Sequence, residues 1–207
     1  MMMRRGTFVF LLLALCASAP MAATSHAKPA RVARVTRAAA NMRVQGTMVG
    51  IGGRFSGRSL PFSLVVNNYT SADDVARLNS ALRSGGEEQL LSTLKGLNAG
   101  RIAVGNNVGV VANAIIATPN GEGGTKLTVL FERWMNIYEL RYGTRSADYR
   151  FGYAEIFLDR AGRGQGTLIP AARVRLEGDN NWIVEDFGVF PARLMGLRAT
   201  GSVGVAR

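Results

Sequence analysis

Hydrophobic and polar positions alternate with a period of two along most of the chain after Val44, as in strands that face a core on one side. Clusters of Gly, Asn and Asp separate the alternating runs at intervals of roughly 10–15 residues. This layout predicts a mainly β fold, an antiparallel β-sandwich or barrel of about eight or nine strands in a single domain over residues 44–200. The expected strands cover residues 44–52, 62–69, 101–104, 108–118, 125–138, 149–159, 168–176, 182–189 and 192–200.

One segment departs from this period. Between the second and third expected strands, hydrophobic residues recur every three or four positions, which predicts an inserted pair of short helices at about 71–84 and 87–97. Ser71 or Thr70 is placed to cap the first helix, and two aspartates follow in its first turn. Gly85 is the expected end of this first helix.

The segment 125–142 fits either type of element. As a helix it would place Glu132 and Glu139 on one face, about 10 Å apart, where they could act as a catalytic pair. As a strand it would send these two side chains to opposite faces, because their spacing is odd. The segments on both sides are rich in β-formers, and 108–118 with the following Gly-rich loop has the layout of a hairpin. We therefore favour a strand over 125–138, paired with 108–118.

The segment YRFGYAEIFLD, residues 149–159, has the most distinctive pattern in the chain. In a strand, one of its faces carries four aromatic residues and two carboxylates, and the other face is small and aliphatic. Such a face is either part of the core or the wall of a ligand pocket, where an aromatic ring could stack on a sugar. With two residues of the preceding expected strand, it forms the candidate ligand face: Glu132, Trp134, Tyr149, Tyr153, Glu155, Phe157 and Asp159.

The first 27 residues have the three regions of a secretory signal peptide: two arginines, an apolar run of roughly a dozen residues and a small-residue end. We expect cleavage near residues 22–27 and a periplasmic or extracellular protein. Cys16 is the single cysteine and His26 the single histidine, so cleavage after Ala27 removes both. The remaining chain would then contain no disulfide, no thiol or histidine nucleophile system and no zinc site built from these residues. No later segment is apolar enough for a transmembrane helix.

The positive charge is concentrated next to this leader. Of the 25 basic residues, seven precede Val44, which leaves 18 against 14 acidic residues in the rest of the chain. Residues 28–43 contain five basic residues and no acidic one, so we expect a basic flexible tail; a second short tail follows at 201–207. The first tail is either a solvated linker or a segment that adheres to an anionic envelope surface. Export makes nucleic acid an unsuitable partner.

The stretches FERW, DYRFGYAEIFLD and GRGQGTLIPAARVRL together give residues 45–198 a general pattern that resembles uncharacterised exported proteins of environmental bacteria. The resemblance implies a bacterial envelope setting and no particular activity.

Three functions fit these observations. The first is a non-catalytic exported β-domain that binds or scaffolds a partner at the bacterial envelope, with no cofactor and no metal. The second is a carboxylate-based hydrolase, for example on glycans, that uses some of Glu132, Glu139, Glu155 and Asp159. The third is a carrier that encloses an apolar ligand. Two carboxylates converging in an open cleft would favour the enzyme, and a closed aromatic interior would favour the carrier.

Overall fold

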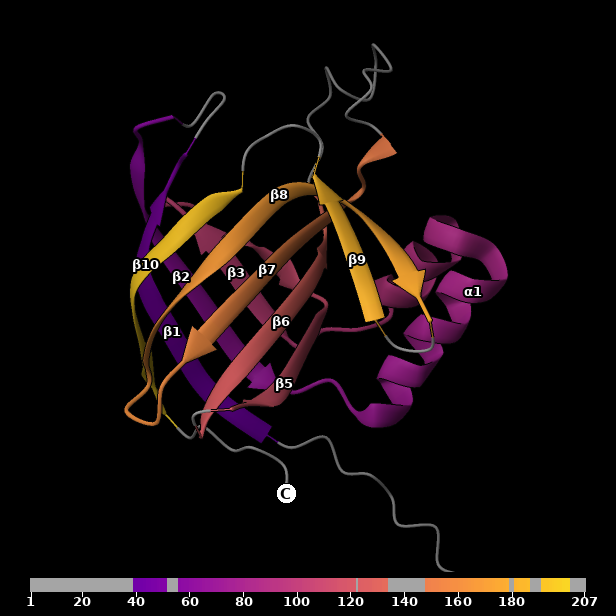
Figure 1. The fold of residues 1–207 in the computed structure, drawn as a ribbon, viewed down its shortest axis with the longest axis horizontal. Helices are drawn as coiled ribbons and strands as arrows, with labels where there is room; N and C mark the ends of the chain where they lie inside the picture. The colour runs from indigo at the N-terminus through magenta and orange to yellow at the C-terminus, as the bar shows by residue number, and fades with distance from the viewer. Residues whose placement is uncertain are drawn as a thin grey trace, which may run out of the picture. The chain divides into compact units, whose positions relative to one another are not determined.

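A computed structural model of the chain describes residues 39–51, 56–121, 123–133, 148–178, 181–186 and 191–201. Within these residues lie ten β-strands and one α-helix (Figure 1). The strands are β1 Ala39–Val49, β2 Ser59–Asn68, β3 Gly100–Val104, β4 Val110–Ala112, β5 Ala114–Asn120, β6 Gly124–Glu132, β7 Phe151–Leu158, β8 Arg163–Glu177, β9 Asn181–Asp186 and β10 Ala192–Thr200; the helix is α1 Ala72–Lys95. The predicted mainly β fold is confirmed.

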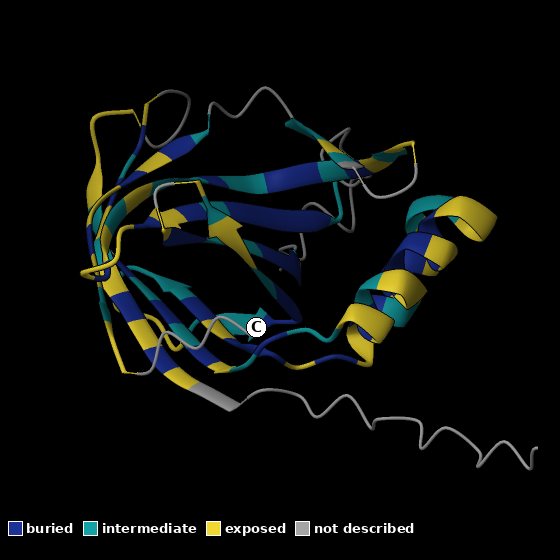
Figure 2. Ribbon diagram, turned by 60° about the horizontal axis from the view of Figure 1, so that its bottom comes forward, coloured by how far each residue is buried: buried dark blue, intermediate teal, exposed yellow. Residues whose placement is uncertain are grey.

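All ten strands belong to one antiparallel sheet, in the order β4-β3-β2-β1-β10-β8-β7-β6-β5, with β9 paired to the far end of β8. The sheet curls so that β1, β2 and β3 face β6, β7 and β8 across a common interior (Figures 1 and 2). It is not closed into a barrel, because its two edge strands β4 and β5 do not pair with each other. They are instead consecutive in the chain, separated by Asn113.

Asn113 bridges the place where the sheet stays open. Its side chain is buried, and its amide nitrogen donates hydrogen bonds to the carbonyl oxygens of Leu94 (3.2 Å) and Leu97 (3.1 Å). Its amide oxygen accepts a hydrogen bond of 3.0 Å from the backbone nitrogen of Glu132. One side chain therefore satisfies backbone groups at the end of α1 and at the end of β6 that no strand ladder reaches.

The main core fills the interior of the curled sheet. Alternate residues of each strand point inward, such as Leu127, Val129 and Phe131 of β6 and Ala154 and Ile156 of β7. These side chains are 0–8% exposed and belong to one cluster with residues of β1, β2 and β10. In the part of the chain that the structure describes, these side chains thus pack together in the interior of the sheet.

Helix α1 covers part of the opposite, outer face of the sheet. Its leucines form a second buried cluster with Phe151, Tyr153 and Val174, and Figure 2 shows its exposed residues on the side away from the strands. Ser71 is the N-cap, whose hydroxyl accepts a hydrogen bond from the backbone nitrogen of Asp74 (3.1 Å), as predicted. Gly85 and Gly86 have non-helical backbone angles, so α1 consists of the two predicted helical segments joined at a kink.

The structure also answers the question about residues 125–142 for the part that it describes. Residues 124–132 form β6, which pairs with β5 in an antiparallel hairpin in which Ala114 faces Leu130 and Pro119 faces Thr125. The strand prediction is confirmed over this range, and a helix spanning Lys126 to Arg141 is excluded. Trp134 and Glu139 lie outside the described residues, as do the expected leader and residues 28–38 of the expected tail.

The sheet begins earlier in the chain than the pattern indicates. Strand β1 starts at Ala39, five residues before the expected domain start at Val44, and Met42 is 1% exposed in the core. Residues 39–43, assigned above to a flexible tail, are therefore part of a strand in the middle of the sheet. Asn113 likewise divides one expected strand, 108–118, into β4 and β5. In the part of the chain that the structure describes, no helix is long and apolar enough to cross a membrane.

Candidate functional site

The outer face of β7 changes from covered to exposed along its length. Strand alternation sends Phe151, Tyr153, Glu155 and Phe157 to this face and the intervening residues to the core. Phe151 and Tyr153 are buried against α1 and its neighbours, whereas Phe157 is 39% exposed. The aromatic face predicted from the sequence is therefore core at one end and solvent-accessible at the other.

At the boundary between these halves, three polar groups form a hydrogen-bonded cluster. The Tyr153 hydroxyl donates to Glu155 Oε1 at 2.7 Å, and Lys126 Nζ of β6 lies 2.6 Å from the same oxygen. Burial acts to raise the pKa of Glu155, but hydrogen bonds from Lys126 and Tyr153 and the Lys126 charge outweigh it and lower this pKa. Burial, followed by the interaction with Glu155, raises the pKa of Tyr153 far above its ordinary value. Tyr153 is thus held neutral and Glu155 ionised.

Phe157 lies between polar residues of both neighbouring strands. In the sheet register it faces Lys126 of β6 on one side and Gln165 of β8 on the other. The Lys126 ammonium is 5.6 Å from the centre of the Phe157 ring, near the outer limit of a cation–π contact. The exposed Phe157 side chain is therefore flanked on both sides by side chains that can form hydrogen bonds.

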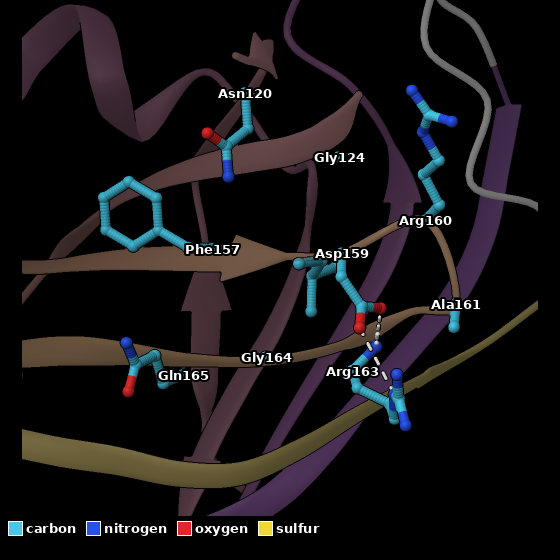
Figure 3. A pocket seen from close by; sticks show the side chains of 10 residues that line it. Asn120, Gly124, Phe157, Asp159, Arg160, Ala161, Arg163, Gly164 and Gln165 are labelled. Atoms are coloured by element: carbon cyan, nitrogen blue, oxygen red, sulfur yellow. Dashed lines mark hydrogen bonds and ion pairs between the residues drawn. The ribbon is translucent and has the colours of Figure 1, made fainter. Parts of the chain in front are cut away.

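Asp159 closes the turn between β7 and β8. Its carboxylate accepts hydrogen bonds from the backbone nitrogen of Arg163 (2.8 Å) and from Arg163 Nε (3.2 Å), drawn as dashed lines in Figure 3. The backbone hydrogen bond from Arg163 has the largest effect on the pKa of Asp159 and lowers it. Burial acts in the opposite direction, but the side-chain hydrogen bond and the charge of Arg163 add to the lowering. This carboxylate stays ionised, and its first role is to shape the hairpin.

These residues border an open pocket of about 830 Å³ on the outer face of the sheet (Figure 3). Four strands and the β7–β8 turn contribute to it, and Figure 3 shows the Phe157 ring between Asn120 of β5 and Gln165 of β8. Gly124 of β6 lies directly against the backbone of β7, where a Cβ atom would collide with the Leu158 carbonyl oxygen. Asn120, Phe157, Asp159, Arg160, Arg163 and Gln165 are its principal lining side chains.

The pocket combines one apolar surface with groups that donate and accept hydrogen bonds. The amides of Asn120 and Gln165 each offer both functions, the Asp159 carboxylate accepts, and the guanidinium groups of Arg160 and Arg163 donate. Among the described residues, no ion pair involves Arg160. The arrangement suits a ligand with an apolar face and several hydroxyl groups at its edge.

The remaining predicted site residues lie elsewhere. Glu132, at the other end of β6, forms an ion pair of 3.1 Å with Lys95. Tyr149 lies before β7 with its ring 5.7 Å from the guanidinium carbon of Arg173. Trp134 lies outside the described residues. The structure therefore brings Phe157 and Asp159 into one pocket, places Tyr153 and Glu155 beside it, and separates Glu132 and Tyr149 from it.

The pocket includes residues that the sequence analysis missed. Asn120 precedes the β5–β6 turn and Gln165 follows the β7–β8 turn, and both positions resemble ordinary turn flanks in the sequence. Counting outward from the two turns would have placed Gln165 opposite Phe157 and Lys126 on its other side. This strand register was the one signal in the sequence that could have placed Gln165 and Lys126 beside Phe157.

The geometry gives little support for carboxylate catalysis. Each described carboxylate of the candidate face has a basic partner: Glu132 has Lys95, Glu155 has Lys126 and Asp159 has Arg163. Acid catalysis on a glycoside needs a carboxyl group with a raised pKa, whereas those of Glu155 and Asp159 are lowered. Within the described ranges, no group of three or more His, Cys, Asp or Glu side chains could hold a metal ion.

In comparisons with protein-family models, with curated proteins and with solved structures, nothing matches the chain.

Proposed function

We propose that this protein is an exported, non-catalytic binding domain of the bacterial envelope, and that the pocket around Phe157 binds a carbohydrate. The observation that carries the proposal is the exposed Phe157 ring, set among Asn120, Gln165 and Asp159 on a rigid sheet. A sugar ring has an apolar face of C–H groups that stacks on an aromatic ring, and hydroxyl groups at its edge that bond to amides and carboxylates.

The support around Phe157 favours binding over a merely structural role. The ring projects from a strand that is paired on both sides, so its position is set by the sheet rather than by a loop. Lys126 is held next to it by its ion pair with Glu155, and Arg163 by its bonds with Asp159. Polar groups that are already oriented lose little conformational entropy when they bind a ligand.

The alternative of a carboxylate hydrolase on glycans would share this substrate class. It is the weaker proposal because the carboxylates beside the pocket have lowered pKa values and basic partners. Glu155 and Asp159 are also four residues apart on one strand, about 13 Å, which exceeds the ~5–9.5 Å separation used by glycosidases.

Export and envelope location rest on the sequence pattern of the first 27 residues and on the resemblance described above. We propose that the basic residues before the sheet add a nonspecific attraction to anionic envelope polymers, while the pocket provides selectivity. Intact-mass measurement of protein recovered from the periplasm or the medium tests the location: a chain that begins between Ala23 and Lys28 is expected. A chain that retains the leader contradicts export.

Binding to a panel of immobilised bacterial and plant oligosaccharides tests the ligand class. The unaltered protein is expected to bind a subset of the panel, and Phe157→Ala should lower its affinity for them at least tenfold, about 1.4 kcal/mol or more. Ile183→Ala is the matched control, because Ile183 is equally exposed at 39% but lines no part of the pocket. Unchanged binding by Phe157→Ala, or no binding to any glycan, would contradict the proposal.

A further inference from the structure

A second concave surface lies at the opposite end of β6 from the Phe157 pocket. It is an apolar cleft of about 620 Å³ between the β3–β4 turn, the end of β6 and the middle of β8. Most of its lining is hydrocarbon, with Asn107 and Arg133 as the polar residues, and its floor is the edge of the main core. Its larger apolar side chains are Ile102, Val104, Val108, Val110, Phe131 and Leu168.

Val108 is the most informative residue of this cleft, because it is 82% exposed at the tip of the β3–β4 turn. The turn is well braced: Asn107 Nδ2 donates to the Val104 carbonyl oxygen (2.9 Å), and Asn107 Oδ1 accepts from the Gly109 nitrogen (3.0 Å). The nitrogen of Gly105 also donates to the Pro61 carbonyl oxygen at 2.8 Å. The braced turn therefore holds the exposed Val108 side chain at the rim of the apolar cleft, and the two together form one continuous apolar surface.

A polar depression adjoins the cleft and places basic side chains at its rim. The two surfaces share Gly109, Val110 and Arg133, and the depression adds Lys95, Arg101 and Glu132. Among the described residues that line the depression, Lys95, Arg101 and Arg133 are basic and Glu132 is acidic, and Lys95 forms an ion pair of 3.1 Å with Glu132. Arg101 Nη1 donates to the Gly109 carbonyl oxygen (3.1 Å) and Arg133 Nη1 to that of Tyr149 (3.0 Å), so backbone oxygens position both guanidinium groups at the rim.

The depression exists because the sheet does not close between β4 and β6. Asn113 spans this opening at one level through its bonds to Leu94, Leu97 and Glu132. Beyond it, towards Val110 and Arg133, the two strands are not paired, and the depression lies there. The same break in the ladder therefore creates both the opening and its cationic rim.

From this geometry we infer that the cleft binds a single-chain anionic amphiphile such as a fatty acid. The alkyl chain lies in the apolar cleft beneath Val108, and the carboxylate lies in the depression near Arg101 and Arg133. Burying methylene groups against the cleft supplies the affinity, and the guanidinium groups select the negative headgroup. This site is separate from the Phe157 pocket, shares no lining residue with it, and stands or falls independently of the carbohydrate proposal.

Isothermal titration calorimetry with sodium dodecanoate, below its micellar concentration, tests the inference. One dodecanoate is expected to bind per protein, with octanoate weaker because its chain is shorter. Dodecyltrimethylammonium should bind at least tenfold more weakly than dodecanoate, because its headgroup has the wrong charge. Absence of dodecanoate binding, or equal affinity for the cation, overturns the inference.

Three variants locate the site. Val108→Asp places a carboxylate in the cleft at an exposed position, where it should not disturb folding, and should lower dodecanoate affinity at least tenfold. Ile183→Asp introduces the same charge at an exposed apolar residue outside the cleft and should leave affinity unchanged. Arg133→Gln should weaken dodecanoate but not dodecanol, which separates headgroup recognition from a structural effect. Equal loss in the two aspartate variants, or equal loss of both ligands in Arg133→Gln, contradicts the assignment.

Discussion

At the scale of single residues, the Phe131 ring of β6 packs directly against Gly152 of β7. The two residues face each other in the register, and a Cβ atom at position 152 would collide with the Phe131 ring. Gly152→Ala is therefore expected to destabilise the protein by overpacking, by about 1–3 kcal/mol. Phe131→Ala should cost about 3–5 kcal/mol, because the ring is buried in the core.

A double-mutant cycle measured by urea denaturation separates these effects. In the Phe131→Ala background the collision is absent, so Gly152→Ala should cost much less than in the unaltered protein. Additive losses would show that the glycine is needed for another reason.

Asn113 is the second residue on which the fold depends, because three backbone groups have its side chain as partner. Asn113→Leu would leave the carbonyl oxygens of Leu94 and Leu97 and the nitrogen of Glu132 without it, at an expected cost of about 3 kcal/mol or more. Asn98→Leu is the control, since Asn98 is exposed nearby and should change stability by less than about 0.5 kcal/mol. A loss below 1 kcal/mol for Asn113→Leu would show that the fold does not depend on the hydrogen bonds of this side chain.

The Tyr153–Glu155–Lys126 cluster predicts a defined dependence of stability on pH. The pKa of Glu155 is lowered in the folded state from its ordinary 4.5, so the unfolded chain binds a proton at this site more readily. The cluster's contribution is therefore fully present above pH 4.5 and is lost as the pH falls through the folded pKa. Glu155→Gln should flatten the acid side of the curve of unfolding free energy against pH, measured by urea denaturation from pH 7 to pH 3.

Lys126→Met should also flatten the acid side of the curve of unfolding free energy against pH. Its effect should not add to that of Glu155→Gln, because both substitutions remove the same ion pair. If Glu155→Gln leaves the acid side of this curve unchanged, other carboxylates govern acid unfolding.

At the scale of elements, α1 shows how local signals are translated into structure. The Ser71 hydroxyl accepts a hydrogen bond from the Asp74 backbone nitrogen and donates one to the Asp74 carboxylate (2.8 Å). Ser71→Ala should therefore cost about 1 kcal/mol of stability. Ser80→Ala, at an exposed position within the helix, should be neutral or slightly stabilising, because alanine is the better helix former. Equal effects in thermal unfolding would show that the cap contributes nothing.

These elements also show what the amino-acid pattern could and could not predict. A helix cap at Ser71 or Thr70, the end of the first helical segment at Gly85 and the β5–β6 hairpin all depend on neighbours in the sequence, and they were predicted. The division of 108–118 at Asn113 was not, because β4 and β5 share one alternating pattern and differ only in their partners, β3 and β6. Pairing between distant strands leaves no trace in the periodicity of a single strand.

The candidate site likewise has features that depend on the local sequence and features that depend on contacts between distant segments. Tyr153, Glu155, Phe157 and Asp159 share a face by strand alternation alone, and this could be deduced from the sequence. Which of them is covered depends on where α1 lies over the sheet, and that contact joins segments about 70 residues apart.

At the scale of the whole molecule, the start of the sheet determines how much of the basic segment is structural. Deleting residues 28–38 is expected to shift the melting temperature by a degree or two, since the sheet begins at Ala39. Deleting residues 28–43 removes Met42 from the core and pairs of β1 with both β2 and β10, so it should lower the melting temperature by ten degrees or more. Similar shifts for both deletions, in differential scanning calorimetry, would contradict this boundary.

The molecule has two concave surfaces with different chemistry: a polar pocket around an exposed ring near the β7–β8 turn, and an apolar cleft with a cationic rim near the β3–β4 turn. We propose that the first of these binds carbohydrate. Chemical-shift mapping by ¹H–¹⁵N NMR, with the oligosaccharide that binds best in the panel, can locate the binding site. We expect the perturbed backbone amides to cluster at Asn120, Gly124 and residues 155–165, and Phe157→Ala to abolish these changes. Perturbations confined to other parts of the sheet, or unchanged in Phe157→Ala, would contradict it.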